Sequence, residues 1–135
     1  MKIFLLCFIL FFLFMISNKT YIKKSKINGD GLYSNIYFKK NEIILDNLFP
    51  NKDSDELLYD IINKDKFNKY ISEEGTKINH CSKKFNSKVY TNDYKIYKLV
   101  ATKDIKKNTE ITCNYDITNK KYPFIDNSKS WYKKC

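Results

Sequence analysis

Residues 101–116 read ATKDIKKNTEITCNYD, which is the end of one strand, a polar turn and a second strand that finishes on an aromatic residue. The residues before it, 95–101, alternate between polar and apolar side chains with the period of a β-strand, and residues 111–115 predict another short strand. Taken alone, the stretch predicts a hairpin whose final aromatic side chain, Tyr115, packs in a core.

Upstream, residues 76–86 read TKINHCSKKFN and contain the only histidine of the chain, His80, directly after Asn79. A lone histidine is more often structural than catalytic. Cys81 is adjacent to His80 in the sequence, and the chain has no second histidine to complete a metal site. Neither metal ligation nor a cysteine–histidine nucleophile therefore fits this motif well.

Further upstream, residues 29–33 read GDGLY. A GxG of this kind usually marks a tight turn, but glycines also let backbone amides approach a ligand carboxylate closely. One helix is predicted at residues 54–62, where a polar cap precedes apolar residues at helical spacing. The further predicted strands are residues 36–38, 43–45 and 88–90. The sequence thus predicts a mainly β domain with one short helix and irregular loops.

Together these motifs resemble the SET methyltransferase family, whose pattern is a GxG, a helix-bearing insert, NHSCxPN and then AxxDIxxGEELxxDY. Here they stand in the same order as GDGLY at 29–33, INHCSKKFN at 78–86 and ATKDIKKNTEITCNYD at 101–116. Residues 38–44, FKKNEII, also resemble the family's FxKGExI. The resemblance spans about residues 26–135, and the absence of flanking modules is similar to stand-alone viral SET proteins.

The resemblance implies a β-clip fold of short strands with one short helical insert and a knot-like crossing of two loops. It also implies that S-adenosylmethionine binds on one face and that the substrate lysine enters by a narrow channel from the other. By position, the residues that would bind the cofactor are Gly29, Asp30, Gly31, Leu32, Asn79, His80, Tyr115 and Trp131. The glycine-rich backbone would hold the methionine part, and Asn79 and His80 would contact the amino group and the adenine.

Tyr115 is the expected catalytic residue, with its hydroxyl beside the transferring methyl group. A free lysine is protonated at pH 7, because its unperturbed pKa is about 10.4. An aromatic channel with little water lowers that pKa and favours the neutral amine that accepts a methyl group. The expected channel residues are Tyr70, Tyr90 and Phe124, with Tyr94 and Tyr97 as further candidates. The expected activity is lysine N-methylation, with histone tails or other exposed protein lysines as substrates.

The C-terminal tail departs from the family pattern. The family's cysteine-rich zinc segment is missing, and only Cys135 stands in its place, so no zinc site is expected. Phe124 and Trp131 are the tail residues that would close over the adenine or the lysine channel. The four cysteines (Cys7, Cys81, Cys113 and Cys135) contain no CxxC pair, and reduced thiols in a cytosolic environment are expected.

The N-terminal residues 1–17 form a separate hydrophobic segment, which is expected to be helical. Residues 3–16 form an unbroken apolar run of fourteen, about 21 Å of helix, shorter than a bilayer core of about 30 Å. A signal peptide or a short anchor both fit this length, but no small-x-small cleavage site follows. Lysines are more numerous after the run than before it, which favours an uncleaved anchor with the domain in the cytosol. The alternative is entry into the secretory pathway after signal cleavage.

The remaining boundaries are a basic linker at 18–25, the SET domain at 26–118 and the tail at 119–135. The net charge is +10, but all 25 basic residues are lysine and none is arginine, the side chain best suited to reading nucleic acid. We therefore expect only non-specific attraction to nucleic acid. Two rival functions remain open, a catalytically silent SET-like peptide-binding module and a basic membrane-surface or nucleic-acid-binding protein. A homodimer also remains open.

Overall fold

The computed structural model describes residues 18–50, 71–92, 96–115, 117 and 135. Within these residues it contains seven strands and one short helix, which confirms the predicted mainly β class. The strands are β1 (Thr20–Lys24), β2 (Asp30–Ser34), β3 (Ile43–Leu45), β4 (Asn79–His80), β5 (Ser87–Tyr90), β6 (Lys98–Ala101) and β7 (Glu110–Cys113). The helix is α4 (Glu73–Thr76), and the side chain of Ser72 caps it by accepting a hydrogen bond from the N–H of Gly75.

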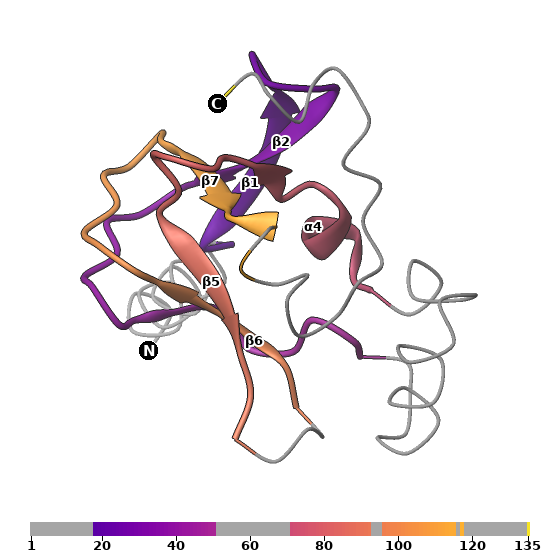
Figure 1. Ribbon diagram of the computed structural model, residues 1–135, viewed down its shortest axis with the longest axis vertical. Coiled ribbons are helices and arrows are strands. Elements are labelled where there is room, and N and C mark those ends of the chain that lie inside the picture. Colours follow the sequence, from indigo (N-terminus) through magenta and orange to yellow (C-terminus); the bar gives the residue numbers. More distant parts are fainter. Residues whose placement is uncertain (1–17, 51–70, 93–95, 116, 118–134) are drawn as a thin grey trace, which may run out of the picture.

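Strand β7 is the element that joins the parts of the sheet (Figure 1). The hydrogen-bonded order is β1-β2-β7-β5-β6-β3, and β4 also pairs with β7. The β2–β7 pair is antiparallel, whereas β4 and β5 both run parallel to β7. Three motifs that are far apart in the sequence therefore meet along one strand of four residues.

The core lies under this sheet and is closed by residues from both of its halves. Leu32 on β2, Leu99 on β6 and Ile111 on β7 are completely buried. Phe38 and Ile105 form an antiparallel bridge between two loops, and their N–H groups donate to each other's carbonyls at 2.9 and 2.8 Å. This bridge brings the turn before β7 against the segment before β3. The hairpin predicted for residues 101–116 is wrong, because β6 pairs with β3 and β5, whereas β7 pairs with β2, β4 and β5.

The predicted strands agree with the structure in part. Residues 43–45 and 88–90 are extended as predicted, but residues 36–38 contribute only the bridge at Phe38. The strand predicted at 95–101 begins at Lys98, and the one predicted at 111–115 ends at Cys113. The end of β7 is set by the contacts of Asn114 and Tyr115 described below rather than by the alternation of side chains.

Two predicted elements fall outside the described residues, namely the hydrophobic segment 1–17 and the helix at 54–62. The helix that the structure does describe, α4, was not predicted. In the part of the chain that the structure describes, no helix is both long and apolar enough to cross a membrane.

Candidate active site

The first part of the site is a carboxylate on β7 that collects hydrogen bonds from three other segments. Glu110 accepts from Ser25 Oγ at 2.6 Å and from Asn79 Nδ2 at 2.9 Å through Oε1. Through Oε2 it accepts from the hydroxyl of Tyr33 at 3.2 Å. The Glu110 carboxylate therefore ties together β2, β4 and the loop that leads into the GxG motif.

The two positions of the GxG motif hold glycine for different structural reasons. Gly29 has a φ of +48°, a left-handed conformation that glycine adopts without steric cost. Gly31 lies within β2, and a Cβ built there would come within 2.5 Å of Glu110 Oε1. The motif is therefore a turn residue followed by a strand residue that lets a carboxylate approach the backbone.

Asn79 connects the GxG motif to β4. Its side chain is almost fully buried, and Nδ2 donates to the carbonyls of Asn28 at 3.1 Å and Asp30 at 3.3 Å, in addition to Glu110. The N–H of Leu32 donates to the carbonyl of Lys77 at 2.9 Å, which extends the contact along the strand. The predicted cofactor-binding residues 29–32 and 79–80 are therefore brought together.

Tyr115 is held against the same strand, β4, on its other side. Its main-chain N–H donates to His80 Nδ1 at 3.0 Å, and the two rings lie 5.2 Å apart between centroids. The Tyr115 hydroxyl donates to the carbonyl of Ile78. The segment 78–80 thus contacts the GxG motif through Asn79 and the tyrosine through its two neighbours, which brings all three sequence motifs together.

The loop 81–86 packs around the end of β7. The N–H of Cys81 donates to the carbonyl of Cys113 at 2.9 Å, and Asn114 Nδ2 donates to the carbonyl of Ser82 at 3.1 Å. The side chain of Asn86 donates to the carbonyl of Glu110 at 2.8 Å and accepts from the N–H of Thr112 at 2.9 Å. These contacts bring together the two chain segments that the expected loop crossing requires, although the threading itself stays a prediction because residues 118–134 are not described.

The expectation that all cysteines are reduced is wrong for one pair. Cys81 and Cys135 form a disulfide, with Cα atoms 4.6 Å apart, although they are 54 positions apart in the sequence. The carbonyl of Cys135 also accepts a hydrogen bond from Ser82 Oγ at 3.1 Å, so the C-terminal residue lies against the loop that follows His80. Because the pairing depends on this tertiary contact, cysteine spacing alone did not reveal it.

Two side chains near the site have shifted proton affinities. Partial burial, followed by the negative charge and hydrogen bond of Glu110, raises the pKa of Tyr33 above its ordinary value. Burial raises the pKa of the Cys113 thiol to about 12, and its contact with Ser87 Oγ opposes that shift. Both groups are therefore protonated at neutral pH, and Tyr33 is a hydrogen-bond donor to Glu110.

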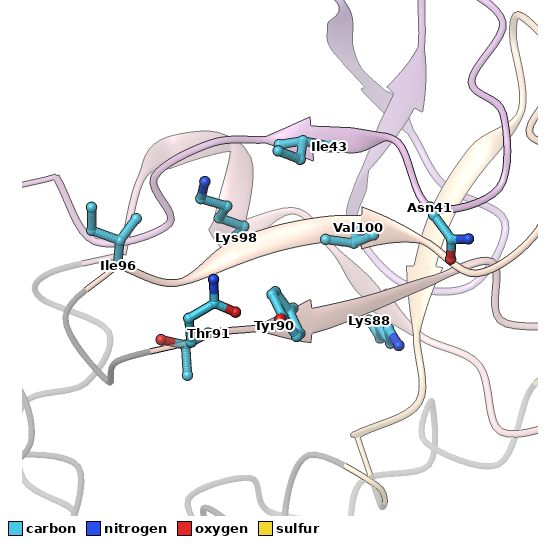
Figure 2. A pocket seen from close by; sticks show the side chains of 9 residues that line it. Asn41, Ile43, Lys88, Tyr90, Thr91, Ile96, Lys98 and Val100 are labelled. Atoms are coloured by element: carbon cyan, nitrogen blue, oxygen red, sulfur yellow. The ribbon is translucent and has the colours of Figure 1, made fainter.

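The predicted channel residues are not assembled in the described structure. Tyr90 is 47% exposed and lines a groove of about 450 Å³ on the outer face of β3, β6 and β5, and no contact joins it to Tyr115 there. Figure 2 shows Tyr90 on β5, with Lys98 and Val100 on the neighbouring strand β6 and Ile43 on β3. Tyr97 is buried and packs edge-on against Phe49 in the core. The other predicted aromatic residues lie outside the described residues, namely Tyr70, Tyr94, Phe124 and Trp131.

Several residues of the hydrogen-bonded site around Glu110 were not singled out from the sequence. Glu110, Ser25, Tyr33 and Asn86 all contribute hydrogen bonds to it. The signal for Glu110 was present, because it occupies an acidic position of the motif that ends in Tyr115. The side chain of Asp30, by contrast, pairs with Lys24 at 3.2 Å and Lys77 at 3.9 Å, so only its backbone faces Asn79. No cluster of three or more metal-ligating side chains occurs among the described residues.

Comparisons with known proteins match this arrangement to a family. The family model described as the SET domain matches residues 15–116, a range that contains the GxG motif, Asn79, His80, Glu110 and Tyr115. A search of curated proteins finds no match.

Two solved structures are similar to the chain. One is a candidate histone methyltransferase of Plasmodium falciparum, with 25% identity, a TM-score of 0.48 and coverage of 74% of this chain and 95% of that chain. The other is a humanized mutant of the Polycomb Repressive Complex 2 of Chaetomium thermophilum bound to an inhibitor, with 21% identity and a TM-score of 0.49. That alignment covers 73% of this chain and 15% of that chain.

Proposed function

The chain belongs to the SET domain family, since the family model spans residues 15–116 of its 135 residues, and from this membership we propose that it is a methyltransferase. We propose that the methyl donor is S-adenosylmethionine and that the acceptor is the side-chain amine of a protein lysine. The observation that carries the proposal is the convergence of Gly31, Asn79 and Tyr115 on β4 and β7. These three residues come from the three motifs that the family resemblance assigns to cofactor and catalysis.

The described residues fit the methionine end of the cofactor. The amide nitrogen of Asn79 is used by three protein acceptors, which leaves its oxygen as the group that faces a donor such as an ammonium. The backbone at Gly29 carries no side chain that would keep a ligand away, and a Cβ built there would meet no atom within 4 Å. We propose that these segments hold the amino acid part of the cofactor, that His80 lies at the adenine, and that Trp131 covers it.

When bound, S-adenosylmethionine supplies a methyl group carried on a sulfonium. The protein's task is then to present a neutral amine in line with that group and to exclude water. We propose that Tyr115 is the catalytic residue, because the two hydrogen bonds at its ends fix both its backbone and its hydroxyl. Tyr70 and Phe124 remain proposed channel residues. Tyr90, which was expected beside them, lines the separate groove on β3, β6 and β5.

Histone tails or other exposed lysines are the proposed substrates. Among the described residues, the groove on β3, β6 and β5 is lined by Lys88 and Lys98 and by no acidic side chain, so this lining does not favour a basic tail. We propose that the substrate enters elsewhere.

Anchoring by residues 1–17, with the domain in the cytosol, also remains a proposal. Because disulfides are rare in the cytosol, the Cys81–Cys135 bond favours the secretory alternative.

The test uses the full-length chain in mild detergent, radiolabelled S-adenosylmethionine, and a panel of core histones and nucleosomes. Wild type should transfer label to lysine, and Tyr115→Phe should transfer far less. Tyr21→Phe is the matched control, because it removes an exposed tyrosine hydroxyl that contacts only Asn108 among the described side chains. Cofactor binding in calorimetry without any transfer would favour the silent binding module. Absence of both would overturn the proposal and leave the basic-surface hypothesis, which predicts steeply salt-dependent binding.

A further inference from the structure

Glu110 has no assigned role, yet it accepts the shortest of the hydrogen bonds that Asn79 Nδ2 makes. The other two acceptors are the carbonyls of Asn28 and Asp30. An amide nitrogen has only two hydrogens, so three acceptors around it compete for them. Glu110 Oε1 accepts from Nδ2 at 2.9 Å, whereas the two carbonyls lie at 3.1 and 3.3 Å, so the contact with Glu110 is the best formed of the three. Glu110 is therefore the partner that dominates the orientation of this side chain.

The orientation of an asparagine amide decides what it offers to a ligand. Turning the amide by half a rotation would place Oδ1 against Glu110 and two carbonyls, which would bring four acceptors together without a hydrogen. With Nδ2 on the protein side, Oδ1 points away from all three acceptors, and no hydrogen bond to Oδ1 occurs within the described structure. The side chain thus presents an acceptor, not a donor, to whatever lies beside β4.

We propose that Glu110 is a positioning residue that locks the Asn79 amide so that Oδ1 accepts a hydrogen bond from the ammonium group of the cofactor. The inference rests on the proposed use of S-adenosylmethionine and gives a reason for the buried network around β7. It also accounts for Gly31, because any side chain there would meet Glu110 Oε1 at 2.5 Å and displace it.

The remaining contacts of Glu110 provide matched variants. Tyr33 donates to Oε2, on the opposite oxygen from Asn79, so Tyr33→Phe leaves the Oε1 contact in place. Glu110→Gln keeps one oxygen, which can accept from Asn79 and Ser25, while its nitrogen donates to the Tyr33 hydroxyl. Glu110→Ala removes the acceptor altogether. The glutamine variant therefore retains the orientation without the charge, and the alanine variant loses both.

The experiment is calorimetric binding of two ligands to the full-length chain. The first ligand is S-adenosylhomocysteine, which carries the ammonium group, and the second is its deaminated 2-oxo analogue, which lacks that group. Wild type should prefer the first by roughly tenfold to a hundredfold, the usual range for a hydrogen bond to a charged group. Glu110→Ala should reduce this ratio several-fold, whereas Tyr33→Phe and Glu110→Gln should leave it within about twofold of wild type. Asn79→Ala should abolish the preference for the first ligand. When Glu110→Ala is added to Asn79→Ala, the ratio of the two affinities should not change further.

Each result has a defined consequence. A loss of affinity for both ligands in equal proportion in Glu110→Ala would reduce Glu110 to a structural role and overturn the inference. A ratio that falls as far in Glu110→Gln as in Glu110→Ala would mean that Glu110 acts through its charge, which also overturns it. If wild type binds neither ligand, the proposed cofactor is wrong, and this outcome is distinct from a failure of Glu110 alone.

Discussion

The main-chain N–H of Tyr115 donates a hydrogen bond to Nδ1 of His80 at 3.0 Å, directly after β7 ends at Cys113. Because Nδ1 is the acceptor, this nitrogen of the imidazole carries no proton. Together with the bond from the Tyr115 hydroxyl to Ile78, it fastens the tyrosine to residues on both sides of Asn79. The position of the proposed catalytic residue is therefore set by the segment 78–80, which is proposed to bind the cofactor.

The His80 contact predicts a difference between two substitutions. His80→Asn can keep an acceptor close to the position of Nδ1, whereas His80→Leu leaves the Tyr115 N–H without one. We expect His80→Leu to be less stable than His80→Asn by about 1–3 kcal/mol, the cost of an unsatisfied amide. Urea unfolding of both variants measures the difference. Equal stabilities would show that the N–H finds another partner.

The two glycines of the GDGLY motif should respond differently to alanine. Gly29→Ala meets no atom within 4 Å and costs only the left-handed backbone conformation, about 1 kcal/mol. Gly31→Ala should cost more, because its Cβ lies 2.5 Å from Glu110 Oε1. A double-mutant cycle with Glu110→Ala, followed by urea unfolding, should recover part of the Gly31→Ala loss and none of the Gly29→Ala loss. Additive losses in both cycles would contradict the clash.

The sequence was informative where local pattern and tertiary structure agree. Alternation in residues 95–101 identified β6, and the order of the motifs identified which segments meet at the site. The end of β7 was not predictable from alternation, because Asn114 and Tyr115 leave the strand to bond Ser82 and His80. The spacing of apolar residues in a sequence carries no information about such hydrogen bonds.

Three features required the three-dimensional structure. Helix α4 has four residues, too few for a hydrophobic period to be visible. The hydrogen bonds of Glu110 depend on the pairing of β2 and β4 with β7. The sequence does not reveal which strands are neighbours in the sheet. Tyr90 was expected near the tyrosine of the site, but the pleat of β5 turns it to the outer face while Ser87 faces Cys113.

The Cys81–Cys135 disulfide should contribute measurably to stability. Its loop spans a separation of 54 residues, for which chain entropy gives a stabilisation of about 4 kcal/mol as an upper value. Cys135→Ser, or reduction of wild type, should lower the urea midpoint by a corresponding amount. Reductant should have no further effect on Cys135→Ser, and an effect there would point to another bond. Trapping the thiols while the protein is extracted from cells would report whether the bond exists there.

The buried thiol of Cys113 should make stability fall in mildly alkaline solution. An unfolded cysteine ionises near its ordinary pKa of 9.0, whereas burial keeps the folded thiol protonated up to about 12. Between these values the folded state binds more protons, so the free energy of unfolding decreases as pH rises. The contribution is fully present below pH 9 and should be reduced by about 1 kcal/mol at pH 10.

Cys113→Ala isolates this effect, because the disulfide cysteines do not titrate. Tyr33, whose pKa is also raised, acts in the same direction in both proteins and cancels in the comparison. Urea unfolding between pH 7.5 and 10 should therefore give a steeper decline for wild type than for Cys113→Ala, even though the variant starts from a lower stability. Parallel declines would mean that the folded thiol ionises at its ordinary pKa and that water reaches the Cys113 sulfur beside Ser87.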